Sequence, residues 1–185
     1  MTFFHEISHG LMALITGGKV LKIEMHYSGS GLCYSRGGII WLITVAGYIG
    51  AALWGLLIYL MAGKLPKRYS HITAALLAAV LVVSGILYVR DFASGIIILA
   101  LIIFYGTTVW FRNKLPLQYI LKIAGLYIIL DAVKAPVLLL QHRPVSDATL
   151  LAAQTGVPQL CWILLWLLVS LACLFYIWKI EKRLL

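Results

Sequence analysis

Five long apolar segments, separated by short polar or proline-containing connections, dominate the pattern of hydrophobic and polar positions along the chain. Each segment holds roughly 19–25 residues, enough for an α-helix rising 1.5 Å per residue to cross a hydrocarbon core of about 30 Å. The pattern therefore predicts five membrane-spanning helices. The segments are Gly38–Ala62, His71–Val89, Ala93–Phe111, Leu117–Leu140 and Gln159–Trp178.

A shorter helix is predicted before the first of these segments. Phe3–Ile15 would form only about three and a half turns, near 20 Å, which is short for a span. Gly17 and Gly18 stop it. If this helix also crosses the membrane, it is the sixth crossing, so we expect five to six transmembrane helices.

An amphipathic strand is predicted directly after the two glycines. Apolar and polar residues alternate here up to the turn-forming segment Ser28–Gly31, and Leu32–Ser35 would return as the second strand of a hairpin. The sequence alone leaves open whether this hairpin has a special role. The alternating apolar residues are Leu21, Ile23, Met25 and Tyr27.

A short helix is also predicted between the last two apolar segments. Ser146 suits the N-cap position, and Asp147 suits the first turn, where a carboxylate is stabilised by the helix dipole. Gly156 would end this helix, and Pro158 would open the final segment. Asp147 therefore has a local explanation as a helix-start residue.

Composition excludes an ordinary soluble domain. Hydrophobic residues make up 63% of the 185 residues and charged residues only 11%, with a mean hydropathy of +1.00, whereas soluble domains hold about 45–50% and about 25%. We therefore expect residues 1–185 to form a single all-α integral membrane domain with a short β-hairpin. The net charge of +9 comes from basic residues between apolar runs, a pattern that suits contact with the lipid bilayer rather than nucleic acid.

The sharpest chemical signal is the HExxH motif at His5-Glu6-Ile7-Ser8-His9. Positions i and i+4 share one face of a helix, so the imidazoles of His5 and His9 can reach one metal ion. Glu6 lies beside that face, where it can take a proton from a water activated by the metal. A chance HExxH in a metal-free helix bundle stays an alternative, but this composition produces one in only roughly two of a thousand such sequences. The three cysteines are far apart and predict no thiolate zinc site.

A catalytic zinc ion normally takes three protein ligands, so one more is expected. Of the few remaining carboxylates, Asp131 sits about fourteen residues into an apolar segment, where an ionised carboxylate is costly without a partner. A metal would supply that partner, although an ion pair with Lys134, one helical turn away, is the alternative. We therefore predict Asp131 as the third ligand and keep Asp147 as the alternative.

His5–Leu11, followed by Gly17-Gly18-Lys19-Val20 and the amphipathic strand, resembles the site-2-protease-type intramembrane zinc metallopeptidases, in particular the small bacterial branch without a PDZ domain. The segments Ala46–Gly55 and Val145–Trp162 also fit, so the resemblance covers most of the chain. The Asp-Gly pair of the family's third-ligand helix is absent, because Ala132 follows Asp131.

The resemblance implies a zinc endopeptidase that hydrolyses a peptide bond within or beside the membrane. Two histidines and a later acidic residue would bind Zn²⁺, and Glu6 would activate water. The strand with Leu21, Ile23, Met25 and Tyr27 would pair with an unwound segment of a transmembrane or membrane-adjacent protein substrate.

The resemblance also implies a multi-pass protein of the bacterial inner membrane. A second function stays open: a metal-binding membrane scaffold or regulatory protein that keeps the peptidase fold without cleaving its partners.

Overall fold

A computed structural model describes residues 1–64, 70–110, 117–140 and 146–182 of the chain. The described residues form helices at the five long apolar segments and at both predicted short ones, together with one antiparallel strand pair. The polar connections predicted near residues 65–68 and 112–116 lie outside the described residues. In chain order the elements are α1 (Thr2–Ile15), β1 (Lys19–Met25), β2 (Gly31–Arg36), α2 (Ile40–Lys64), α3 (Ser70–Tyr88), α4 (Phe92–Trp110), α5 (Leu117–Leu138), α6 (Asp147–Thr155) and α7 (Gln159–Lys182).

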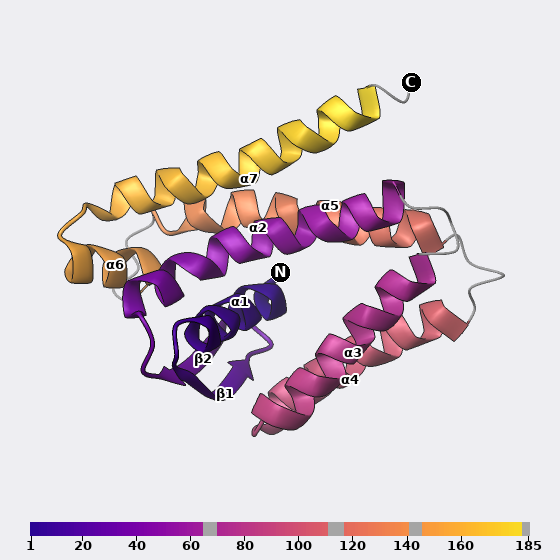
Figure 1. The fold of residues 1–185 in the computed structure, drawn as a ribbon, viewed down its shortest axis with the longest axis horizontal. Helices are drawn as coiled ribbons and strands as arrows, with labels where there is room; N and C mark the ends of the chain where they lie inside the picture. Colours follow the sequence, from indigo (N-terminus) through magenta and orange to yellow (C-terminus); the bar gives the residue numbers. More distant parts are fainter. Residues whose placement is uncertain (65–69, 111–116, 141–145, 183–185) are drawn as a thin grey trace.

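Helix α2 lies at the centre of the structure. It contacts α1 on one side and α5 and α7 on the other, while α3 and α4 form a second pair that meets β1 (Figure 1). The hairpin covers the side of α1 that faces away from α2, so α1 lies between the hairpin and α2 (Figure 1). Helix α6 lies at the end of the bundle where α2 begins, and it contacts both α2 and α7.

The crossing of α2 and α5 is close because two glycines face each other. A Cβ atom added at Gly55 would lie 2.8 Å from the carbonyl oxygen of Gly125, and one added at Gly125 would lie 2.7 Å from the carbonyl oxygen of Gly55. Small residues allow this kind of backbone approach between helices in a membrane, where packing rather than apolar burial drives association.

Three of the described helices are long and apolar enough to cross a membrane: Ile40–Gly63, Ser70–Tyr88 and Gln159–Lys182. The helix-rich membrane class is therefore confirmed, but five to six spans are not. Helix α4 provides a shorter apolar stretch, Phe92–Thr107. Helix α5 is not among the three because it carries three charged residues: Lys122, Asp131 and Lys134.

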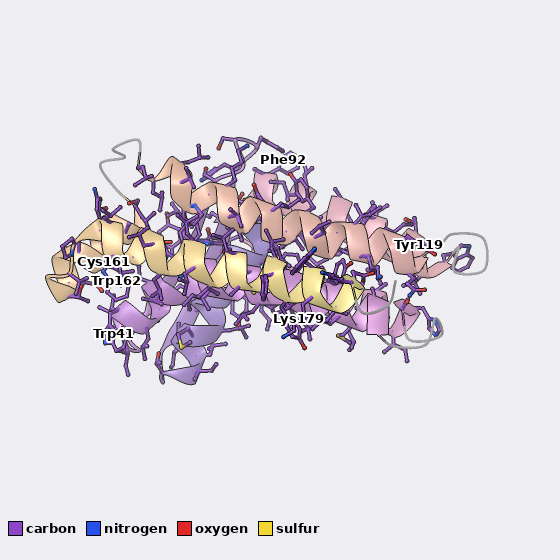
Figure 2. The ribbon with its side chains drawn as sticks, turned by 90° about the horizontal axis from the view of Figure 1, so that it is seen from above. Trp41, Phe92, Tyr119, Cys161, Trp162 and Lys179 are labelled. Atoms are coloured by element: carbon purple, nitrogen blue, oxygen red, sulfur yellow. The ribbon has the colours of Figure 1, made fainter. Side chains whose placement is uncertain are left out.

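Aromatic side chains lie at both ends of the bundle. Trp41 and Trp162 lie near the α6 end, and Tyr119 lies near the opposite end (Figure 2). Tryptophan and tyrosine favour the interface between membrane and water. Between the ends, large apolar side chains such as Leu168 are exposed, as expected for a surface that faces lipid.

The hairpin presents one face to the protein core. Ile23 and Met25 are buried in the same cluster as Phe3, Phe4 and Ile7 of α1. The alternation is interrupted by a bulge between Val20 and Lys22, which takes Leu21 off the face that Ile23 and Met25 share.

Candidate metal centre

Helix α1 presents its functional side chains on two adjoining faces. The His5 and His9 side chains point toward α2, because a Cβ atom added at Gly47 of α2 would lie 2.6 Å from Cε1 of His5 and closer still to the His9 ring. Glu6 points toward the hairpin, because a Cβ atom added at Gly31 would lie 2.8 Å from Oε1 of Glu6. The HExxH helix thus directs its two imidazoles to α2 and its carboxylate to β2.

The structure brings one carboxylate to the two imidazoles, and it belongs to Asp147. Nε2 of His5 lies 2.9 Å from Nε2 of His9 and 3.1 Å from Oδ2 of Asp147. Nε2 of His9 lies 3.4 Å from the same oxygen. A tetrahedral zinc ion with bonds of about 2.0–2.1 Å needs ligand atoms about 3.3 Å apart. The three atoms therefore stand close to the separations that such an ion requires.

A backbone hydrogen bond fixes the His9 ring. Nδ1 of His9 lies 2.7 Å from the carbonyl oxygen of Ile43 in α2. A carbonyl oxygen can only accept, so Nδ1 must carry the proton, and the neutral ring then has its lone pair on Nε2. This second hydrogen bond is the usual means by which a protein orients a metal-binding histidine.

Gly47 leaves room for both imidazoles beneath α2. Since any β-carbon at this position would collide with the His9 ring, only glycine lets α2 pass so close. One turn further on, a Cβ atom at Gly50 would collide with Ser8. These glycines therefore do more than allow general helix packing: they set the distance between α2 and the HExxH helix.

Helix α6 holds Asp147 at its first position. The hydroxyl oxygen of Ser146 accepts from the backbone N–H of Thr149, and Gly156 ends the helix in the left-handed conformation, so both predicted caps are present. Burial disfavours the charged form of Asp147, but hydrogen bonds with His5 and His9 outweigh it and hold the pKa of this carboxyl below its usual value. Asp147 is therefore an anion aimed at two imidazoles.

Asp131, our predicted third ligand, is not brought to the histidines. Among the described residues, the group of potential ligand atoms within 4.8 Å of one another consists of His5, His9 and Asp147. The Asp131 carboxylate lies 3.9 Å from the amine of Met1 and its side chain keeps 35% of its exposure. Depth along a segment was a poor criterion, because it does not tell which face of the helix a carboxylate occupies.

Glu6 is held against the hairpin. Its side chain is 4% exposed, and the Cys33 backbone of β2 donates a hydrogen bond to it. Helix α1 lies outside the candidate spans. Burial raises the pKa of the Glu6 carboxyl to about 7, against the lowering effects of His9 and of the Cys33 hydrogen bond. A carboxylate with a pKa near neutrality is suited to accept and return a proton.

The residues predicted to contact a substrate divide into two groups. Leu21 and Tyr27 are exposed, whereas Ile23 and Met25 are buried in the core. The Met25 backbone N–H donates to the hydroxyl oxygen of Ser94 in α4 at 2.6 Å. The outer edge of β1 is therefore covered by α4 at this residue.

Four residues around the histidines received no specific role from the sequence: Ile43, Gly47, Tyr48 and Trp166. Ile43 acts through its backbone carbonyl, which leaves no signature in a sequence. The spacing of Gly47 and Gly50 was a usable signal, but it also suits plain helix packing.

Comparison with known proteins identifies the family of the chain. A family model described as Peptidase M50B-like matches residues 1–177, which is nearly the whole chain. No curated protein and no solved structure matches the chain.

Proposed function

The chain belongs to the Peptidase M50B-like family, and we propose that it is an intramembrane zinc endopeptidase with His5, His9 and Asp147 as its metal ligands. The observation that carries the proposal is the convergence of these three donor atoms within 4.8 Å of one another, with the Glu6 carboxyl in electrostatic interaction with His9 and Asp147. Two imidazoles and one carboxylate form a typical protein ligand set for a catalytic zinc, which keeps a fourth position for water or substrate.

Each residue of the site has a distinct task. When bound, zinc would polarise the attacking water and the carbonyl of the scissile peptide bond. Glu6 accepts the proton of the attacking water and delivers it to the nitrogen of the departing amine. The burial of Glu6 favours this role, because electrostatic interactions with nearby charges are stronger for a carboxylate that is shielded from water. The Cys33 backbone holds its carboxyl group at the border between α1 and β2.

The substrate must be extended at the cleavage point, because a helix hides its peptide bonds in internal hydrogen bonds. Addition of a strand to a sheet edge would supply that conformation. We place this contact at the outer edge of β2 rather than of β1. That edge borders the proposed base, because the Cys33 N–H of β2 donates to Glu6. A pairing strand would have to take over this N–H, as one on β1 would have to displace Ser94 from Met25. A strand along β2 would pass beside the proposed base.

The experiment compares the wild-type protein with Glu6→Gln in cell membranes. Gln is nearly isosteric but cannot take the proton from water, so Glu6→Gln should keep zinc and lose cleavage. Membranes containing either protein are labelled at free N-termini and analysed by mass spectrometry. We expect new N-termini within or beside transmembrane segments with the wild type only, and their loss when zinc is chelated.

Two results would contradict the proposal in different ways. Identical N-termini with both proteins, together with one zinc ion per chain, would favour the metal-binding scaffold that does not cleave. Absence of bound zinc in the wild type would remove the metal site itself.

A further inference from the structure

The two histidines of the site are oriented by different means. His9 donates from Nδ1 to the Ile43 carbonyl, but Nδ1 of His5 is buried and has no hydrogen-bond partner among the described residues. A metal-binding histidine ordinarily donates its second ring N–H to a carboxylate, carbonyl or water, and that bond fixes the ring. The His5 ring must be held in another way.

Aromatic contacts surround the His5 ring instead. The Tyr48 ring of α2 packs against it with centroids 4.4 Å apart and planes at 72°. The His9 ring packs on it with centroids 4.5 Å apart and planes at 88°. Edge-to-face pairs at these distances are favourable beyond the area they bury. His5 therefore contacts two rings, and rotation of its own ring would break both contacts.

Tyr48 is itself held by Trp166 of α7. Their ring centroids lie 4.5 Å apart, and the Trp166 side chain is fully buried. Its indole Nε1 donates to the carbonyl oxygen of Val45 at 3.2 Å. Because Val45 and Tyr48 lie one turn apart on α2, this bond holds the indole next to the Tyr48 ring. The pair cannot shift without breaking it.

The same indole supports the helix that carries Asp147. Trp166 forms a buried cluster with Ala148 and Leu151 of α6, and Tyr48 packs against that cluster. Ala148 directly follows Asp147. The Tyr48–Trp166 pair thus contacts His5 on one side and the α6 helix on the other, two parts of the site that lie far apart in the sequence.

We infer that Tyr48, backed by Trp166, is a positioning residue that holds the His5 imidazole for metal binding and fixes it relative to Asp147. The inference rests on the proposed metal site and assigns to an aromatic ring the task that Ile43 performs for His9. Tyr48 acts through His5, because its ring packs directly on the His5 imidazole.

The test measures zinc affinity of the full-length protein in lipid nanodiscs by competition with a chelator. Tyr48→Leu removes the ring and should weaken zinc binding about 10–100-fold, the usual cost of losing a group that orients a metal ligand. Tyr48→Phe keeps the ring and should bind zinc nearly as the wild type does. Trp54→Leu is the control, because Trp54 lies on the same helix and packs on Phe4 of α1.

A second readout is the visible absorption spectrum of the Co²⁺-substituted protein, which reports coordination geometry. Tyr48→Leu should change this spectrum, and Tyr48→Phe and Trp54→Leu should not. Trp166→Phe provides an independent variant if Tyr48→Leu does not fold, and it should shift affinity and spectrum in the same direction.

The outcomes separate the inference from the proposed function. If the wild type binds zinc, an unchanged affinity and cobalt spectrum in Tyr48→Leu, or in Trp166→Phe where Tyr48→Leu does not fold, would overturn the inference alone. Equal losses in Tyr48→Phe and Tyr48→Leu would also overturn it, since the hydroxyl would then be the acting group. A wild type that binds neither zinc nor cobalt would overturn both.

Discussion

Nδ1 of His9 donates a hydrogen bond to the carbonyl oxygen of Ile43 over 2.7 Å, and this bond connects the HExxH helix to the first turn of α2. Because it places a ring proton on Nδ1, the neutral, metal-binding form of the ring has its lone pair on Nε2, the atom that faces His5 and Asp147. Helix α2 therefore decides which nitrogen of His9 is available, although it contributes no ligand of its own.

Gly47→Ala should reduce zinc binding sharply. The added methyl group would collide with the His9 ring and lie 2.6 Å from Cε1 of His5, so the imidazoles must turn or α2 must withdraw. Gly95→Ala in α4 is the matched control, because nothing lies within 4 Å of its added Cβ, and alanine in a helix is favoured over glycine by up to about 1 kcal/mol. Zinc content of the two purified proteins is compared; equal content would show that α2 does not confine the imidazoles.

Replacement of either imidazole should empty the site. His5→Ala or His9→Ala removes one of three donor atoms, and two remaining ligands hold zinc poorly. Metal analysis of each purified variant should give far less than one zinc ion per chain. Full stoichiometry in both variants would place the metal elsewhere.

Ser146→Ala should weaken the site indirectly. It removes the hydroxyl that accepts from the Thr149 N–H, and loss of such a cap costs about 0.5–2 kcal/mol. Since Asp147 is the next residue, we expect a lower unfolding temperature together with weaker zinc binding. Ser28→Ala in the exposed hairpin turn is the control. A zinc affinity that stays at the wild-type value would show that the cap does not hold Asp147.

Ser94→Ala should destabilise the contact between α4 and the hairpin. The Ser94 hydroxyl oxygen accepts from the Met25 N–H at 2.6 Å, and both residues are buried. Leaving a buried N–H without a partner costs about 1–3 kcal/mol. Thermal unfolding measures this against Thr107→Ala, an exposed position on the same helix. Equal unfolding temperatures would mean that another group replaces the hydroxyl.

The sequence predicted most elements because their signals are local. Apolar length placed the long helices, alternation and glycines placed the hairpin, and Ser146 and Gly156 mark the ends of α6. The number of spans was harder to predict. An apolar helix such as α5 can carry three charged residues and pack among the other helices without being apolar enough to cross a membrane.

The candidate site was predicted only in part. His5 and His9 share a helix face, so their spacing determines their proximity. The third carboxylate depends on how α6 folds back on α1 and α2, and no local pattern encodes that. Asp131 attracted attention because a carboxylate in an apolar segment is costly, but its side chain retains 35% of its exposure. Ile43 and Tyr48 likewise act through tertiary contacts.

The most direct measurement is the zinc affinity of Asp147→Asn beside that of Asp131→Asn in the otherwise unchanged protein. Asn keeps the size of each side chain and removes its charge. We expect Asp147→Asn to weaken zinc binding more than about 100-fold, beyond the 10–100-fold typical of groups that only orient a ligand. Asp131→Asn should bind zinc as the wild type does. Loss of zinc with Asp131→Asn and retention with Asp147→Asn would contradict the site formed by His5, His9 and Asp147.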